Sequence, residues 1–393
     1  MALPVTIANV QFPTQNNYFG PFLSGGAFYT VLLDSGDASI IEVHKATDPT
    51  DSFAEQDSGD KPDLTNTCRS LWVYQLGTDL HIAHQETTTG RVGYSLFHMA
   101  TDQWDGTFVD LLVEAPTDGP TANALGCSIA VRSDGDVIVL YAGDTDREMG
   151  NPYQRVDYGR KENGTFANVG IAVGGTGATE DWAGSVIVRG SSDRMHFFFA
   201  NRSLNDGFQR TLQSDNTLES LPAAGDSSLD TNLNHPFGPG VSYDDSGTQR
   251  VRCPYSDSSD KVSYAEFDSA NAPGAFTPNV DVSDNTAFAG YYCMAVDGTD
   301  EYLLYADRTD GDLYQDKNDG TDTEVLDGVA VDRISCNGYA RSGQKLAYIY
   351  RDGGTIKYNE ESLGAPPADE PELFELPHHY LAGFNPLHGG FST

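Results

Sequence analysis

Carboxylates crowd one short stretch of the chain, DRTDGDLYQDKNDGTDTE at residues 307–324. Hard cations such as Ca²⁺ take carboxylate and carbonyl oxygens as ligands, so acidic turns of this kind can hold one. Gly311 and Gly320 do not stand at the offset that the Asp-x-Asp-x-Asp-Gly calcium loop requires. We therefore expect solvated turn residues here, with Ca²⁺ as the open alternative and no other cofactor.

Aromatic residues and arginines form a second group, in stretches such as DREMGNPYQ (146–154), TEDWAG (179–184) and NHPFGPG (234–240) that interrupt the regular pattern of the chain. Aromatic rings suit the apolar faces of sugars, and neighbouring polar donors suit the hydroxyls. Ordinary surface residues are the alternative at each position. The residues predicted to contact a ligand are Arg147, Tyr153, Trp182, Arg202, His235, Tyr291, Tyr292 and Arg308.

Three histidines lie near the C-terminal end, His378, His379 and His388, in LPHHYLAGFNPLHGGFST. Adjacent residues of an extended segment point in opposite directions, so we expect no metal site there. The segment follows GAPPADEPE (364–372) and is aromatic and almost uncharged. We expect residues 366–393 to be an extension that docks on a sister subunit or on other proteins of an assembly; packing against its own domain is the alternative.

The elements that must position these residues are repeated. The phrase SDGDVIVLYAGDTD (133–146) has a near-copy in DGTDEYLLYADRTD (297–310). Both belong to a unit made of an apolar strand, an Asp/Ser/Gly turn, a strand ending near Tyr, a polar turn and a third strand. Seven such units are found, at 22–46, 68–104, 127–166, 183–212, 238–267, 293–321 and 336–361.

The repeat length predicts the architecture. Tyr158 and Tyr264 hold equivalent places two units apart, and 264 − 158 = 106 residues gives 53 for each unit. Units of this size with three or four short alternating strands are blades of a β-propeller. We predict an all-β chain whose residues 1–365 form a propeller of seven blades, with six as the alternative. PVTIANVQF (4–12) is expected to close the ring by joining the last blade.

The four strands A to D of a blade run outwards from the centre of the ring. The A–B and C–D turns then share one face, called here the turn face. The B–C and D–A connections share the other, called here the loop face. The predicted sugar contacts fall in the connections of the loop face.

The units resemble the BNR/Asp-box repeats of sialidase-like β-propellers, in lines such as IAVRSDGDVIVLYAGDTD (129–146) and KENGTF (161–166). The likeness covers most of residues 20–365. The full Asp box, Ser-x-Asp-x-Gly-x-Thr-Trp, is nowhere complete; ENGTF (162–166) and NDGTD (318–322) are partial matches.

Sialidase chemistry, which the resemblance implies, needs an arginine cluster, a Tyr–Glu nucleophile pair and an Asp acid/base. The usual Phe/Tyr-Arg-Ile-Pro segment is missing, and residues 1–60 contain no arginine. Arg132, Arg189 and Arg341 recur at the end of strand A, on the turn face, where we expect them to pair with nearby turn carboxylates. No catalytic residue is carried over to this chain.

The composition is strongly acidic, with 58 Asp and Glu against 23 Lys and Arg, a formal net charge of −35. Phosphate backbones would be repelled, so a nucleic-acid partner is excluded. Such an acidic, lysine-poor chain is typical of high-salt environments; an acidic protein of an ordinary source is the alternative. Four of the five cysteines, Cys68, Cys127, Cys293 and Cys336, begin strand candidates and are expected to be small buried thiols rather than disulfides.

These features favour a non-enzymatic structural or receptor- or glycan-binding propeller, carried on a virion (tail, spike or capsid turret) of a virus of a halophilic host. The N-terminal MALPVTIANVQF has no secretory signal pattern and no apolar run is long enough to cross a bilayer, so synthesis in the host cytoplasm without membrane insertion is expected. A sialidase-like glycoside hydrolase and a cytoplasmic cellular scaffold are the alternatives.

Overall fold

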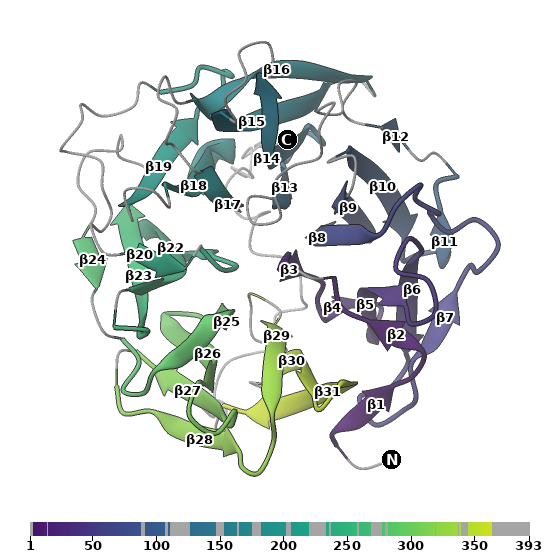
Figure 1. Ribbon diagram of the computed structural model, residues 1–393, viewed down its shortest axis with the longest axis vertical. Helices are drawn as coiled ribbons and strands as arrows, with labels where there is room; N and C mark the ends of the chain where they lie inside the picture. Colours follow the sequence, from purple (N-terminus) through teal and green to yellow (C-terminus); the bar gives the residue numbers. More distant parts are fainter. Residues whose placement is uncertain are drawn as a thin grey trace, which may run out of the picture.

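A computed structural model of the chain shows seven antiparallel sheets arranged as blades around a common centre (Figure 1). The prediction of a seven-bladed β-propeller is therefore confirmed, and the seven units of the sequence are the seven blades. The structure describes residues 3–13, 15–87, 91–106, 109–110, 126–146, 153–162, 165–174, 182–201, 206–219, 233–235, 237–257, 259–268, 277–279, 282–318, 320–336, 338 and 345–363.

Each blade is listed from the centre outwards. Blade 1 contains β4 (Phe22–Ser24) and β2 (Val10–Gln11), both beside β5 (Ala27–Asp34), then β6 (Ile41–Ala46) and β7 (Ala54–Gln56). Blade 2 contains β8 (Cys68–Leu76), β9 (Asp79–Glu86), β10 (Val92–His98), and the short β11 (Gln103–Trp104) and β12 (Val109–Asp110). Blade 3 contains β13 (Cys127–Val131), β14 (Val137–Asp146), β15 (Tyr153–Glu162) and β16 (Thr165–Gly174).

The remaining blades follow the same plan. Blade 4 contains β17 (Trp182–Arg189), β18 (Met195–Asn201) and β19 (Asp206–Leu212). Blade 5 contains β20 (Leu233–His235) and β21 (Val241–Asp245), both beside β22 (Thr248–Asp257), then β23 (Val262–Asp268) and β24 (Thr277–Asn279). Blade 6 contains β25 (Ala287–Asp297), β26 (Asp300–Asp307), β27 (Leu313–Lys317) and β28 (Thr323–Leu326). Blade 7 contains β29 (Val331–Cys336), β30 (Lys345–Asp352), β31 (Thr355–Ser362) and β1 (Val5–Ile7).

The N-terminal strand closes the ring as predicted. β1 pairs antiparallel with β31, and Val5 lies opposite Tyr358 in the register. The segment 4–12 does not stay in one blade, however, because β2 pairs with β5 of blade 1. The two halves of the predicted closing strand thus join the last blade to the first.

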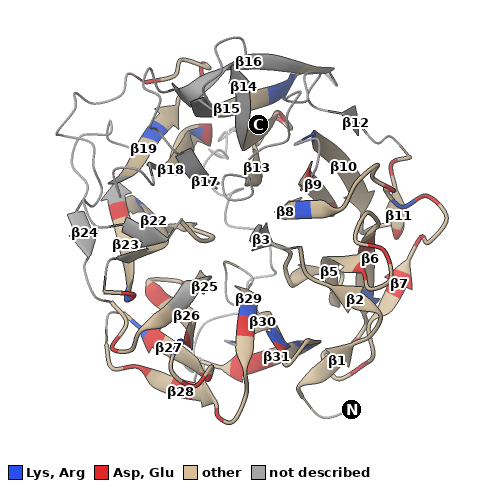
Figure 2. Cartoon of the chain, viewed as in Figure 1, with Lys and Arg blue, Asp and Glu red and all other residues tan. Residues whose placement is uncertain are grey.

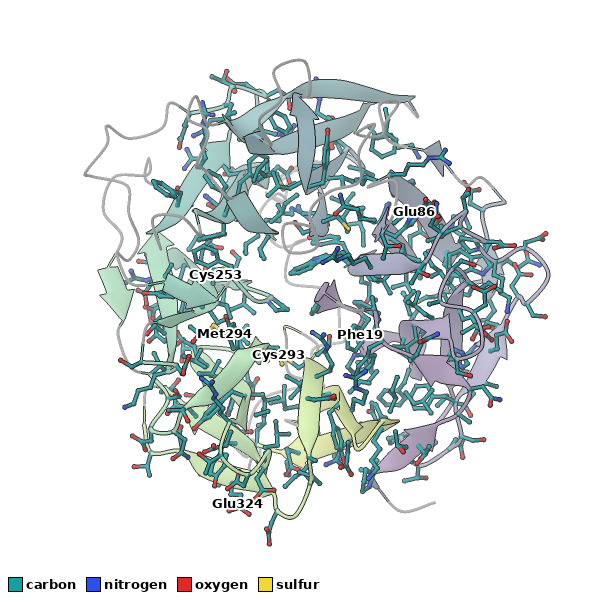
Figure 3. All side chains as sticks on the ribbon, viewed as in Figure 1. Phe19, Glu86, Cys253, Cys293, Met294 and Glu324 are labelled. Carbon is teal, nitrogen blue, oxygen red and sulfur yellow. The ribbon has the colours of Figure 1, made fainter. Side chains whose placement is uncertain are left out.

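Between β2 and β4 the chain enters the middle of the ring. Within it β3 (Gln15–Tyr18) pairs in parallel with the innermost strand of blade 2, β8. The Ser335 hydroxyl of blade 7 accepts a hydrogen bond from Phe19 N (3.3 Å) and donates one to Gly20 O (2.8 Å). Phe19 is buried near the centre (Figure 3). The seam between blades 7 and 1 is therefore fastened on its inner side as well as at the rim.

The conformation of the turns explains why Asp, Ser and Gly recur in the repeat. In the turn 132–136 Gly135 has φ +92°, which favours glycine, and Asp136 N donates to Asp134 Oδ1 at 3.0 Å.

Apolar side chains from facing sheets fill the spaces between blades, with large contributions from buried tyrosines such as Tyr302, Tyr305, Tyr348 and Tyr350.

The state of the cysteines and the helix content of the described residues agree with the predictions. All five cysteines are buried free thiols; Cys68 Sγ and Cys127 Sγ both donate to Ser70 O, at 3.3 and 3.8 Å. The described residues contain one short 3₁₀ turn, Ser191–Asp193, and no α-helix. None of the described segments is a helix long and apolar enough to cross a membrane.

Candidate functional site

Five of the eight predicted ligand contacts lie where strands reach the loop face of blades 3 to 6. Tyr153 begins β15 opposite Asp146, and Trp182 begins β17 opposite Asn201. The others are His235, at the end of β20, Tyr291, in β25, and Arg308, directly after β26. Arg147 and Arg202 lie outside the described residues. For Tyr153, Trp182, His235 and Tyr291 the structure describes the course of the backbone.

Tyr292 is not a surface residue, and its prediction as a ligand contact is wrong. Its side chain is 1% exposed, and its ring packs against Gly238, where an added Cβ would lie 2.8 Å from two ring carbons. Burial raises the pKa of its phenol. The sequence reading placed the pair Tyr291–Tyr292 in a loop, but strand β25 already begins at Ala287. The apolar run AFAGYYCMAV is the signal of a buried strand that was missed.

Arg308 lies on the loop face with an exposed side chain and forms an ion pair with Asp260, across the boundary between blades 5 and 6. Two backbone hydrogen bonds hold the same loops together: Arg308 N donates to Thr286 O at 2.9 Å, and Ala287 N donates to Asp260 O at 2.7 Å. The guanidinium and the carboxylate thus offer a donor and an acceptor side by side at a fixed place. Sugar hydroxyls are recognised by such pairs.

A pair of carboxyl groups that the sequence did not reveal lies beside these loops. Asp284 N donates to Asp322 Oδ2 at 2.6 Å, and Asp322 N donates to Asp284 Oδ2 at 3.3 Å. The Tyr305 hydroxyl also donates to Asp322. Burial, with the charge of Asp284, raises the pKa of Asp322. With so many donors on one oxygen, Asp322 fastens the 282–286 connection to blade 6.

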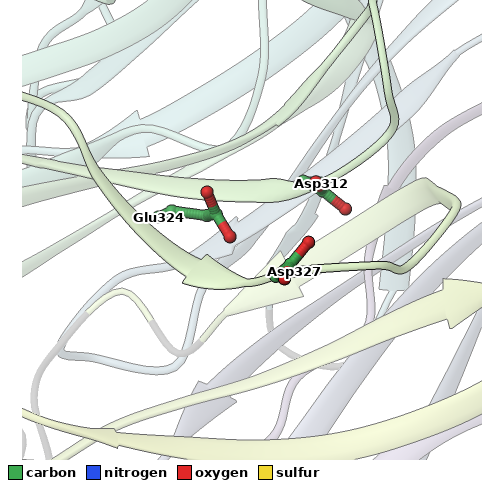
Figure 4. A group of neighbouring side chains, drawn as sticks. All are labelled: Asp312, Glu324 and Asp327. Atoms are coloured by element: carbon green, nitrogen blue, oxygen red, sulfur yellow. The ribbon is translucent and has the colours of Figure 1, made fainter.

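Three carboxylates at the rim of blade 6 come close enough to share a hard cation (Figure 4). One oxygen each from Asp312, Glu324 and Asp327 lies within 4.8 Å of the others. Asp312 is buried and accepts a hydrogen bond from Val329 N at 3.1 Å. Asp312 and Glu324 belong to the acidic stretch 307–324, and Asp327 follows it. The three residues lie on or next to the adjacent strands β27 and β28 rather than in one loop. Calcium binding at these turns stays a prediction.

The charges of this group affect one another. Desolvation raises the pKa of Glu324, and the negative charges of Asp327, Asp312 and Asp310 raise it further. We expect Asp327→Asn to lower the pKa of Glu324 towards its ordinary value, because one neighbouring negative charge is removed. Carboxyl-detected NMR titration measures this pKa. Asp51→Asn, on blade 1, is the control and should leave it unchanged; an equal pKa in wild type and Asp327→Asn would show that these carboxylates do not interact.

The repeated arginines on the turn face serve the joints between blades. Arg189 pairs with the turn carboxylate of Asp193 at 2.7 Å, as predicted. Arg132 does not pair with a carboxylate, because its guanidinium donates to Asn216 Oδ1 (2.5 Å) and Gln213 O (2.8 Å) of blade 4. Arg341 lies outside the described residues. A shallow polar groove is also found between Lys45 and Gln56, at the C–D turn of blade 1 and thus on the turn face.

No protein-family model matches this chain, and no curated protein matches its sequence. Solved structures do match its fold. An α-L-arabinanase of Penicillium chrysogenum in complex with arabinobiose is similar at 12% identity over 92% of this chain and 99% of that one, with a TM-score of 0.53. An ulvan lyase of a polysaccharide lyase family is similar at 11% identity over 92% and 96% of the two chains, with a TM-score of 0.53.

A Hadza microbial sialidase is also similar, at 8% identity over 91% of this chain and 66% of that one, with a TM-score of 0.50. At these identities the likeness establishes the fold alone, a β-propeller. With no family model matched, descent from the BNR/Asp-box repeats stays a prediction.

Proposed function

We propose that this propeller binds a saccharide on its loop face, across blades 3 to 6. The observation that carries the proposal is the backbone position of Tyr153, Trp182, His235, Tyr291 and Arg308, which lie towards the loop face of four consecutive blades. Aromatic residues and a partly exposed guanidinium paired with Asp260 suit the two sides of a sugar ring. The solved structures of the same fold include proteins named for action on arabinan, ulvan and sialosides, which supports a glycan as the ligand class.

The proposal is tested by binding to a panel of oligosaccharides, followed by calorimetry with the best ligand. We expect Trp182→Ala and Arg308→Ala each to weaken binding about fivefold, because each removes one contact worth about 1 kcal/mol. Lys317→Ala is the control, since Lys317 is exposed on the turn face and pairs with Asp300. Binding to no member of the panel, or equal binding by all three variants, would contradict the proposal. Release of products that Asp260→Asn abolishes would establish a glycan-processing enzyme instead of a binding protein.

In its finer form, we propose that the propeller is a particle protein of a virus of a halophilic host, attached through residues 366–393. The support is the net charge of −35, which suits an exposed surface in brine, and the aromatic, almost uncharged segment 376–393. Native protein is expected to co-purify with virus particles and to be lost from them when residues 366–393 are deleted. A chain that sediments free of particles in an infected culture, or a truncated chain that still joins them, would refute this form while leaving saccharide binding untouched.

A further inference from the structure

The outer edge of blade 3 differs from the outer edges of blades 1, 2, 5, 6 and 7. Their rim strands β1, β7, β24 and β28 have 3, 3, 3 and 4 residues, and β11 and β12 of blade 2 have 2 each. The rim strand of blade 3, β16, has 10 residues and lies along the outside of the ring (Figure 1). Within the described part of the chain, no strand pairs with its outward edge.

A sheet edge presents unpaired N–H and C=O groups, and natural proteins protect such edges by keeping them short, charged, bulged, interrupted by proline or covered by another segment. Strand β16 reads TFANVGIAVG and has neither a charged residue nor a proline. It therefore lacks the protection of shortness, charge and proline and has only the two register shifts in its pairing with β15, although it is the longest of these rim strands. An edge with this length and composition is suited to accept another strand.

The charge distribution indicates which partner the edge accepts. Residues 153–212, which include β15 to β19, contain seven Lys or Arg and six Asp or Glu, a net charge of 7 − 6 = +1. The other residues contain 23 − 7 = 16 basic and 58 − 6 = 52 acidic side chains, a net charge of −36. Asp and Glu recur on the blades that run from β25 round the ring to β11 (Figure 2). Two copies of this chain would repel each other strongly on those sides and only weakly at blades 3 and 4, where residues 127–212 contain nine basic and eleven acidic side chains, a net charge of 9 − 11 = −2.

We propose that β16 pairs with β16 of a second copy of this chain, antiparallel and about a two-fold axis, and so extends two four-stranded blades into one eight-stranded sheet. A two-fold axis beside the strand makes the contact self-complementary and closed at the dimer. The pairing joins the propellers rim to rim and leaves both loop faces accessible. Added salt strengthens it, because salt screens the repulsion between the acidic remainders of the two copies.

The test is the mass of the full-length protein in solution, by sedimentation equilibrium at about 0.1 M and about 2 M NaCl. Wild type is expected to be a dimer whose dissociation constant falls as salt rises. The double variant Ala167→Lys/Ala172→Lys places charges on the edge and is expected to raise the dissociation constant at least about tenfold. Ala54→Lys, on the exposed rim strand β7 of blade 1, is the matched control and should dimerise like wild type. A wild-type monomer at 2 M salt, or a double variant that dimerises normally, overturns the proposal.

Hydrogen exchange of the wild type gives a second reading that does not depend on the variants folding. The amides of residues 165–174 that point away from β15 are expected to exchange slowly in concentrated solution and faster after dilution, because only dimerisation covers them. Fast exchange at every concentration would mean that the edge is uncovered. Slow exchange at every concentration would mean that another part of the same chain covers it. Either result refutes pairing with a second copy.

Discussion

Gly93→Ala is expected to destabilise the propeller by about 3 kcal/mol, among the larger costs of overpacking a core. Gly93 in β10 lies opposite His84 in β9, and the imidazole ring covers the glycine. A Cβ at position 93 would lie 3.0 Å from Nδ1 of His84 and closer still to Cε1 and Nε2. His84 is buried between blades, and burial lowers its pKa to about 3, so the ring is neutral and has no room to withdraw.

Urea unfolding followed by tryptophan fluorescence measures the cost. Gly59→Ala is the matched control, because nothing lies within 4 Å of a Cβ built at Gly59. The control should change the free energy of unfolding by less than about 0.5 kcal/mol. A Gly93→Ala protein as stable as this control would mean that the His84 ring can turn aside and that the packing around Gly93 is looser than the contacts indicate.

Much of the fold follows from local chemistry, which explains why the sequence predicts it. Each A–B turn needs residues such as Asp134 and Gly135, and each strand needs alternating apolar side chains. The sequence of every blade therefore contains this pattern. Ring closure by Val5–Ile7 followed from the need to cover the last open edge.

The features that escaped prediction depend on contacts between distant parts of the chain. Strand β3 has no alternating pattern, and it is a strand only because β8 lies beside it in the middle of the ring. Asp312, Glu324 and Asp327 are brought together across adjacent strands, so no spacing within one loop reveals them. The predicted saccharide site stays a prediction, and of its residues Tyr292 is buried in strand β25 and cannot contact a ligand.

The joints between blades hold the charged groups whose loss is expected to matter most for stability. Arg252 in β22 of blade 5 is the clearest case, and its side chain is 14% exposed. Its Nε donates to Glu266 Oε2 at 2.6 Å, its Nη1 pairs with Glu301 of blade 6, and its guanidinium carbon lies 4.3 Å from the centre of the Tyr264 ring. The Tyr243 hydroxyl also donates to Glu301. One guanidinium thus pairs with two carboxylates at the boundary of blades 5 and 6.

Arg252→Met is expected to cost about 3–5 kcal/mol of folding free energy at neutral pH. Methionine preserves much of the apolar contact with Tyr264, but it leaves Glu301, whose side chain is 9% exposed, without its cation. A buried carboxylate without a partner can escape its cost only by taking up a proton. The deficit of the variant relative to wild type should therefore shrink as the pH is lowered towards the pKa that Glu301 acquires.

Two further variants separate the loss of charge from the loss of packing. Arg351→Met removes two 2.6 Å hydrogen bonds to Asp332, whose side chain is 44% exposed. It should cost less than about 1 kcal/mol, because water replaces the lost partner. Glu301→Gln in the Arg252→Met background removes the stranded charge and should restore part of the lost stability. If Arg252→Met proves no more harmful than Arg351→Met, the blade boundary is open to water and the ion pair is no more than a surface contact. If the second substitution restores nothing, lost packing rather than the stranded carboxylate explains the cost.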